Sequence, residues 1–143
     1  GLDLLDYYFG PIGDVQGFSG NQSGVAPVED TVVGSWVFES GIHGSGVWCF
    51  SSWKEEDVVE IHGTAGRISF SVLDVPSPVI VETERDVEAL SYDAPEHVQQ
   101  PLIQTAVDEL RGLGTCPSTG GSAVRTDRVL DLLRSTGTKG AAS

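Results

Sequence analysis

The sequence predicts an α+β fold, in which a large, open and mostly antiparallel sheet has helices packed on one face and an interface on the other. Three observations predict it. Helical periodicity occurs only near the two ends of the chain, consecutive strand patterns fill the middle, and two of these strands are apolar on both faces. The length of 143 residues suits one domain with a hydrophobic core. We expect residues 1–134 to form this domain, and residues 135–143, rich in Gly, Ser, Thr and Ala, to form a flexible tail.

The first expected element is a helix whose apolar periodicity starts at the first residues of the sequence. No Ser, Thr, Asp or Asn precedes it to cap its first turn, and Gly10 stops the run. The chain has no Met at all, so we expect Gly1 to be a processing site, a cloning boundary or a truncation. The apolar stripe of this helix consists of Leu2, Leu5, Tyr8 and Phe9.

The middle of the chain reads as seven strands, and their succession along the chain favours antiparallel pairing. Gly63 and Gly66 suit a tight hairpin between the fourth strand and the fifth. The glycine-rich residues 41–46 link two strands and open no helix that could hold a phosphate, so we expect a hairpin connection there. The expected strands cover residues 14–19, 31–38, 46–53, 57–62, 67–73, 79–82 and 89–92.

Two helices close the chain. Residues 98–110 carry their apolar side chains on one helix face, and Gly112 is a suitable stop. The second helix runs from about residue 120 to residue 134, with Ser118 or Thr119 as its N-cap. Its Gly-Gly opening could bind an anion, but the Lys of a nucleotide-binding loop does not follow, so a plain helix start is favoured.

Two strands are apolar on both faces, whereas a sheet with one wet face alternates apolar and polar residues. In residues 31–38, Val33 and Val37 point one way while Trp36 and Phe38 point the other. Helices can cover only one face, so we expect the second face to meet another subunit or domain. The alternative is that the large side chains are half-exposed near the strand ends.

The net charge is −13 and the sequence pI is about 4.3, which disfavours nucleic acid and anionic membrane surfaces as partners. No apolar run is long enough to span a bilayer, and no signal segment is present. Cys49 lies in an apolar strand pattern, where we expect a buried thiol. With only one other cysteine, Cys116, the sequence favours reduced thiols and a cytoplasmic protein, although a disulfide stays open.

The residues alone contain no complete catalytic constellation. None of the three histidines, His43, His62 and His97, has a partner at a metal-ligand spacing, so no metal site is expected. Neither cysteine lies in a nucleophile motif. His97 precedes a helix in a connection that could reach a pocket, although a structural role is the commoner alternative.

Several short segments, each weak alone, occur in an order and spacing that make a specific match. They include the opening helix, a hairpin of the type I-x-G-T-x-G-x-I, and the connection between the closing helices. The segments are residues 2–5 with 9–12, 28–31 with 38–41, 60–68, 100–110 and 116–120. Together they resemble the C-terminal domain of the Gfo/Idh/MocA oxidoreductases, the relatives of glucose–fructose oxidoreductase and inositol dehydrogenase.

The resemblance implies a fold and a role. Members of the family have an N-terminal Rossmann domain that binds NAD or NADP, followed by an α+β domain built on a large open sheet. That second domain supplies much of the substrate pocket and, through the outer face of its sheet, the oligomer interface. The implied reaction is hydride transfer between the nicotinamide and a CH–OH or carbonyl carbon of a sugar, polyol or diol. The implied partners are the chain's own Rossmann domain, further copies of the chain in a homo-oligomer, and a small-molecule substrate.

The resemblance also implies site residues. The family's His-x-x-Asp pattern would place its histidine immediately before Gly1 and its aspartate at Asp3, which is the expected catalytic residue. An Asp in a first turn equally complements the helix dipole. His97 and Trp53 are expected to line the substrate pocket.

The dinucleotide fingerprint Gly-x-Gly-x-x-Gly and the family's Glu-Lys-Pro lysine do not occur in this sequence. We therefore expect the chain alone to bind no NAD or NADP and to be inactive. The alternative is a non-catalytic oligomerisation or protein-interaction module derived from the same domain.

Overall fold

The computed structural model describes residues 1–135, whose contacts divide the chain into two compact units. Unit 1 combines Gly1–Trp53 with the described part of Pro117–Ser143, and unit 2, Lys54–Cys116, is inserted between these segments. The predicted α+β class is confirmed by the helices and antiparallel sheets of the described residues. The strands form two separate sheets, of three and four strands, in place of the single large sheet expected.

The domain boundaries predicted from the sequence, residues 1–134 and a tail from 135, stay a prediction. Ser135 is the last residue of a helix, and the rest of the expected tail lies outside the described residues. Among the helices of the described residues, none is long and apolar enough to cross a membrane.

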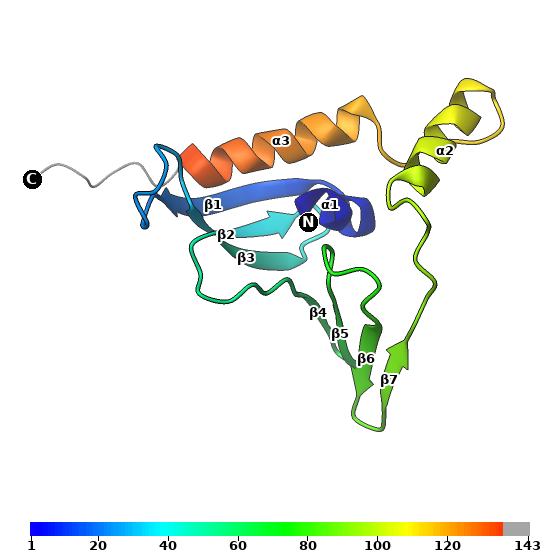
Figure 1. The fold of residues 1–143 in the computed structure, drawn as a ribbon, viewed down its shortest axis with the longest axis horizontal. Helices are drawn as coiled ribbons and strands as arrows, with labels where there is room; N and C mark the ends of the chain where they lie inside the picture. The colour runs from blue at the N-terminus through cyan, green and yellow to red at the C-terminus, as the bar shows by residue number, and fades with distance from the viewer. Residues whose placement is uncertain (136–143) are drawn as a thin grey trace, which may run out of the picture. The chain divides into compact units, whose positions relative to one another are not determined.

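Unit 1 is a three-stranded antiparallel sheet in the order β1-β2-β3, with α3 lying along one face (Figure 1). The helix α1 is uncapped by any side chain, as the sequence predicts, and it packs beside α3. The elements are α1 (Leu2–Phe9), β1 (Ile12–Gly20), β2 (Thr31–Phe38), β3 (His43–Cys49) and α3 (Gly120–Ser135).

A row of glycines lets α3 approach the sheet closely. Gly17 on β1 and Gly34 on β2 are paired neighbours, and both lie beneath Leu133 of α3. A Cβ atom at Gly17 would lie 2.6 Å from the carbonyl oxygen of Leu133 and 2.9 Å from its Cα, so a larger residue there would force the helix away from the sheet. A Cβ atom at Gly34 would overlap the end of the Leu133 side chain. Leu133 is 1% exposed as a result. The buried apolar side chains of the described chain are Leu2, Trp36, Phe38, Val129 and Leu133, all in unit 1.

The opposite face of this sheet is covered by no described element of unit 1. We call it the open face. Its apolar members include Phe18, Val33 and Val47, which are 71%, 41% and 68% exposed. The residues of the open face alternate along the strands with the residues facing α3, and they are Asp14, Gln16, Phe18, Gly20, Thr31, Val33, Ser35, Val37, His43, Ser45, Val47 and Cys49.

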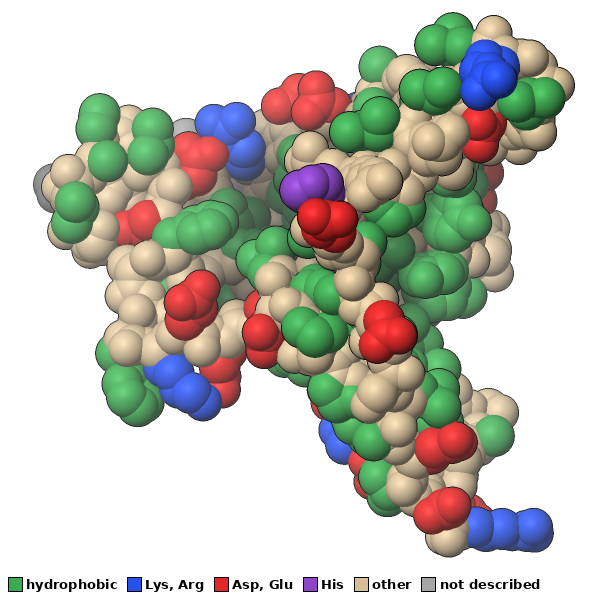
Figure 2. Space-filling view, turned by 45° about the vertical axis from the view of Figure 1, so that its right-hand side comes forward, with side chains coloured by type: hydrophobic (Ala, Val, Ile, Leu, Met, Phe, Trp, Pro, Cys, Tyr) green, Lys and Arg blue, Asp and Glu red, His purple; other side chains and the backbone are tan. Residues whose placement is uncertain are grey.

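Unit 2 is a meander of four antiparallel strands in the order β4-β5-β6-β7, followed by α2. None of its side chains is buried. Figure 2 shows hydrophobic side chains at the surface in the region of β6 and β7, at the bottom of the view, where Val87 and Leu90 are 63% and 45% exposed. The elements are β4 (Val59–Gly63), β5 (Gly66–Phe70), β6 (Val79–Thr83), β7 (Val87–Leu90) and α2 (Gln100–Leu110).

The first part of the glycine-rich segment 41–46 lies in the connection between β2 and β3, as expected, and Gly41 has a positive φ there. The rest of the segment belongs to β3, which begins at His43 and ends at Cys49. Gly44 and Gly46 serve packing inside the strand. A Cβ atom at Gly44 would lie 2.3 Å from Trp36 Nε1, and one at Gly46 would lie 2.6 Å from a ring carbon of Trp48. The strand predicted over residues 46–53 is thus displaced toward the N-terminus.

The predicted strands over residues 57–62 and 67–73 are each shorter than expected. At their outer ends, hydrogen bonds to the Asp57 side chain take the place of backbone hydrogen bonds between the two strands. The carboxylate of Asp57 accepts hydrogen bonds from the Ser71 hydroxyl at 2.5 Å and from the amides of Val72 and Leu73 at 2.6 and 2.7 Å. We call this the Asp57 bracket. It lowers the pKa of Asp57, with the Ser71 hydroxyl as the largest cause.

One predicted burial assignment is wrong. Cys49 is exposed, because it lies at the end of β3 with its thiol toward the hydroxyls of Thr31 and Ser51. On α1, Tyr8 of the apolar stripe is 58% exposed, whereas the acid Asp6 is 6% exposed.

Candidate active-site region at the helix ends

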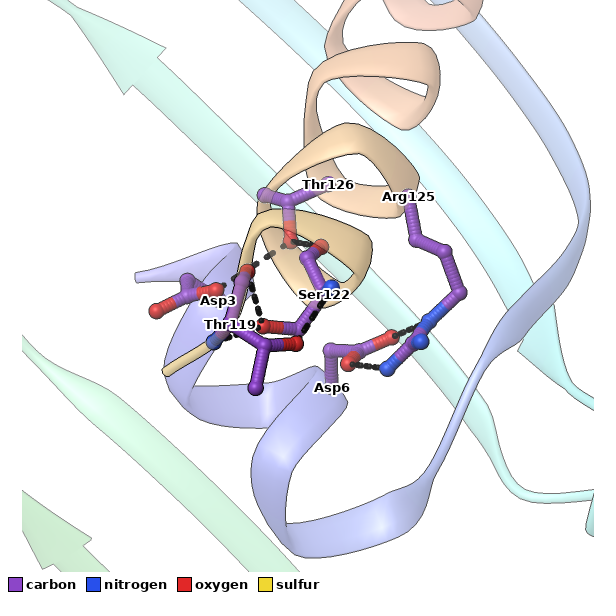
Figure 3. A network of polar contacts seen from close by, with 6 residues as sticks. All are labelled: Asp3, Asp6, Thr119, Ser122, Arg125 and Thr126. Carbon is purple, nitrogen blue, oxygen red and sulfur yellow. Dashed lines mark hydrogen bonds and ion pairs between the residues drawn. The ribbon is translucent and has the colours of Figure 1, made fainter. Parts of the chain in front are cut away.

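The first turns of α1 and α3 meet in unit 1 and bring together six polar side chains (Figure 3). We call this group the helix-end cluster. It is the part of the described chain where the expected catalytic residue, Asp3, has polar neighbours. Its members are Asp3 and Asp6 from α1, and Thr119, Ser122, Arg125 and Thr126 from the start of α3.

An ion pair between the buried Asp6 and the half-exposed Arg125 joins the two helices. Arg125 Nη2 donates to Asp6 Oδ2 at 2.7 Å, and Arg125 Nε donates to Asp6 Oδ1 at 3.3 Å. Asp6 is 6% exposed, and the side chain of Arg125 is 48% exposed. The hydrogen bond that Arg125 donates to Asp6 is the largest cause of the raised pKa of Arg125. The two-point contact fixes the orientation of α1 against α3 and so positions Asp3 one turn earlier.

Asp3 is exposed and only lightly held. Its Oδ1 lies 3.4 Å from the Thr126 hydroxyl, which also lies 3.3 Å from the carbonyl oxygen of Ser122. A hydroxyl has one proton, so it can donate to only one of these acceptors at a time. The Asp3 carboxylate therefore keeps acceptor capacity for a group that approaches the start of α1.

The start of α3 is closed by its own side chains. The Thr119 hydroxyl accepts from the Ser122 amide at 3.3 Å, and the Ser122 hydroxyl accepts from the Thr119 amide at 3.0 Å. This is the reciprocal arrangement of a capping box, with Ser in the position that often holds Glu. Of the two N-caps that the sequence allowed, Thr119 is the one observed. The plain helix start is favoured over an anion site, because one of the amides at this end is already satisfied.

The other two expected pocket residues are both exposed, and their role in a pocket stays a prediction. Trp53 lies beyond β3 and is 94% exposed. His97 is an exposed residue of unit 2, ahead of α2, and its backbone carbonyl accepts from the Gln100 amide. Neither belongs to the helix-end cluster. Among the residues that the structure describes, no group of His, Cys, Asp or Glu could hold a metal ion.

Sequence reasoning missed Asp6, Arg125 and Thr126. A signal for Asp6 exists, because it falls four residues after Leu2 and three before Phe9, on the stripe that faces the core. An acid at such a position needs a basic partner. Nothing local identifies Arg125 as that partner, since it lies 119 residues away in sequence.

Residues 1–69 match the profile of the GFO/IDH/MocA C-terminal domain. Over these residues the chain is similar to the C-terminal domain of the Gfo/Idh/MocA family. The match includes Asp3 and Asp6 but ends before α3, so the partners of these acids in the helix-end cluster lie outside the matched residues.

A curated relative, Oxidoreductase P35 from Formosa agariphila, is 30% identical over 131 residues, which is 92% of this chain and 40% of the relative. This chain therefore spans less than half of that oxidoreductase's length.

Solved structures share the fold at lower identity. UDP-N-acetylglucosamine 3-dehydrogenase GnnA from Acidithiobacillus ferrooxidans matches with a TM-score of 0.81 and 13% identity, over 95% of this chain and 44% of that chain. The WlbA dehydrogenase from Bordetella pertussis, solved with NADH and UDP-GlcNAcA, matches with a TM-score of 0.71 and 19% identity, over 98% of this chain and 41% of that chain.

Proposed function

We propose that this chain is the C-terminal domain of an NAD(P)-dependent oxidoreductase that transfers hydride to or from a sugar, polyol or diol-type CH–OH or carbonyl carbon. In this role the domain supplies part of the substrate pocket and the oligomer interface. The observation that carries the proposal is the family match over residues 1–69, which contains Asp3. The similar proteins support it. P35 is an oxidoreductase, GnnA is a UDP-N-acetylglucosamine 3-dehydrogenase, and the WlbA dehydrogenase was solved with NADH and UDP-GlcNAcA.

Asp3 is the group of this chain that we propose takes part in the chemistry. It is exposed, lightly held, and kept in place by the Asp6–Arg125 ion pair. A carboxylate so placed can orient or exchange a proton with an acid/base group ahead of α1. We propose that the dinucleotide, NAD or NADP, is held by an N-terminal Rossmann domain. The residues described here do not fit it, because the sequence has no Gly-x-Gly-x-x-Gly and α3 begins with a satisfied capping box.

A titration of the chain alone with NADH or NADPH tests the placement of the cofactor. Nicotinamide fluorescence should change only in proportion to added dinucleotide. Saturable binding at micromolar concentration would contradict the proposal that another domain holds the cofactor.

A chimera tests the catalytic half. The N-terminal part of Oxidoreductase P35 is joined ahead of Gly1, and the product is assayed by nicotinamide absorbance with a panel of sugars, polyols and nucleotide sugars. We expect dinucleotide binding and substrate-dependent turnover, and we expect Asp3→Asn to lower kcat without changing dinucleotide affinity. A chimera that binds dinucleotide but turns over no member of the panel would favour the alternative below.

The second candidate function is a non-catalytic module for oligomerisation or protein interaction. The exposure of Phe18, Val33 and Val47 on the open face favours it. The two candidates share the open face as an interface and differ only in whether the helix-end cluster serves a reaction. The chimera assay therefore separates them.

A further inference from the structure

Two neighbouring residues of α3 contact two acids of α1 that lie one turn apart. Asp3 and Asp6 are three residues apart in α1, so they project from the same face of that helix. Arg125 of α3 pairs with Asp6. The next residue, Thr126, has its hydroxyl oxygen 3.4 Å from Asp3 Oδ1. The ion pair fixes the register of the two helices, and this register brings Thr126 to Asp3.

The Thr126 hydroxyl has two acceptors within reach, and they differ in what they need. The carbonyl oxygen of Ser122, at 3.3 Å, lies four residues earlier in α3, where the helix supplies the backbone amide of residue 126 as its partner. It therefore needs no second donor. Asp3 is exposed, and within the described residues Thr126 is the side chain seen to donate to it. A donor bonds more strongly to an ionised acceptor than to a neutral one, so the hydroxyl proton goes to Asp3 whenever Asp3 is ionised.

Two other hydroxyls at the start of α3 take part in the capping box. The Ser122 hydroxyl donates to the Thr119 carbonyl at 2.9 Å and accepts from the Thr119 amide. Its proton is therefore used within α3. Thr126 is partly buried and β-branched, which restricts its χ1 in a helix. Its proton can move between the two acceptors by rotation about the Cβ–Oγ1 bond alone, while the oxygen stays in place.

We propose that Thr126 is a positioning residue for Asp3. Its hydroxyl donates to Oδ1 and holds the carboxylate in one rotamer, which leaves the second oxygen, turned away from α3 in Figure 3, free to meet a group ahead of α1. The inference rests on the proposed function, in which Asp3 takes part in the reaction, and it adds the residue that sets the geometry of Asp3. Thr126 touches no reacting atom in this scheme, so its effect on the reaction passes through Asp3.

The side-chain rotamer of Asp3 tests the positioning directly in this chain. Three-bond couplings from the Asp3 carboxyl carbon to its own backbone nitrogen and carbonyl carbon measure the χ1 populations. We expect one dominant rotamer in the wild-type chain and in Thr126→Ser, which keeps the hydroxyl. Thr126→Val keeps the shape and loses the hydroxyl, so the couplings should move toward the averaged values of a freely rotating side chain. Couplings that are averaged in the wild type, or unchanged in Thr126→Val, would overturn the positioning role.

The P35 chimera tests the consequence for the reaction. Thr126→Val should lower kcat about fivefold, which is less than the loss expected for Asp3→Asn, while KM and dinucleotide affinity stay unchanged. Thr126→Ser should restore most of the lost kcat. In the Asp3→Asn background Thr126→Val should have no further effect, because the carboxylate that it positions is gone. Thr105→Val is the matched control, since Thr105 in α2 of unit 2 also donates its hydroxyl to a backbone carbonyl of its own helix. It should leave kcat at the level of the unsubstituted chimera.

The outcomes separate this inference from the proposed function. A loss of kcat in Asp3→Asn without one in Thr126→Val would overturn the role of Thr126 and leave the role of Asp3 standing. An equal loss from Thr126→Val in both backgrounds would make Thr126 a structural residue of the helix-end cluster and overturn the inference. An unchanged kcat in Asp3→Asn would overturn both. A chimera without turnover would contradict the catalytic role of the chain, and the couplings of Asp3 would still decide whether Thr126 positions its carboxylate.

Discussion

Unit 1 and unit 2 are built from the same kinds of elements but are stabilised in different ways. Unit 1 encloses five apolar side chains and one acid between α1, α3 and its sheet. Unit 2 has none buried, and its hairpins are held by backbone ladders, the Asp57 bracket and exposed ion pairs from Arg67 to Glu60 and Glu82. Antiparallel ladders without a covered apolar face are marginal in water. Unit 1 therefore has a core that can stabilise its own fold. The sheet of unit 2 has no buried side chains, so we expect its folded state to be less stable by itself.

Leu133→Ala should have the largest effect on stability, because it removes a buried side chain from the core of unit 1. Leu133 is 1% exposed and fills the space above Gly17 and Gly34, so its truncation should lower the free energy of unfolding by about 2–5 kcal/mol. Leu110 of unit 2 is 88% exposed, and Leu110→Ala is the matched control, with an expected change within about 0.5 kcal/mol. Urea unfolding followed by tryptophan fluorescence measures both. Equal effects of the two variants would show that the core of unit 1 is not the main source of stability.

The second largest difference should come from the ion pairs, because removing one charge should destabilise unit 1 more than unit 2. Asp6→Asn leaves the buried position without its charge and weakens both hydrogen bonds from Arg125, so we expect a loss of about 1–3 kcal/mol in the free energy of unfolding. Glu60→Gln changes the equivalent contact to Arg67 in unit 2, where both side chains are about 40% exposed, and should have little effect. A large loss from Glu60→Gln would mean that the surface pairs of unit 2 replace a core.

Acid should loosen unit 2 at the Asp57 bracket. The folded pKa of Asp57 is lowered below its usual 3.8, so the carboxylate stabilises the bracket above that pH, and the stabilisation is lost as the pH falls toward the folded pKa. Hydrogen exchange at the amides of Val72 and Leu73 should therefore accelerate below about pH 4, relative to the intrinsic rates. Asp57→Asn should remove most of this pH dependence. An unchanged acid response in that variant would assign it to other carboxylates.

Asp3→Asn should have the smallest effect on stability. Asp3 is exposed, and its contact to Thr126 is 3.4 Å long, so the unfolding midpoint should stay within about 0.5 kcal/mol of the wild-type value. The same change in the P35 chimera should lower kcat by at least about tenfold if Asp3 acts on the proton that moves with the hydride. A midpoint shift as large as that of Asp6→Asn would make Asp3 a structural residue of the helix-end cluster.

The elements whose signals are local were predictable from the sequence. The bounds of β2 match the prediction, and α3 differs only at its last residue. The start of β3 was not predictable in the same way. Gly44 and Gly46 resemble turn residues until the register shows that Trp36 and Trp48 occupy the space above them. The division into two sheets likewise depends on pairing between distant strands, which no local pattern encodes.

The residues of the candidate site likewise include some that the sequence predicts and some that it does not. Asp3 could be singled out because the family resemblance gave its position a role. Its neighbours could not, because Arg125 and Thr126 reach α1 only after α3 docks on the sheet, more than a hundred residues later in the chain. Two-sided hydrophobicity indicated that Val33 lies on a face without a helix, because the residues on both sides of that strand are apolar.

The insertion of unit 2 between the two segments of unit 1 has a consequence for the order of events during synthesis. All three strands of the unit 1 sheet have been synthesised once Cys49 is made. The space above Gly17 and Gly34 stays unfilled until Val129 and Leu133 leave the ribosome about 80 residues later. At roughly 5–20 residues per second, the two stacked tryptophans, Trp36 and Trp48, wait about 4–16 s without their covering helix. The nascent chain is therefore most exposed to aggregation in this interval, and a stop codon just before α3 should send the product to chaperones.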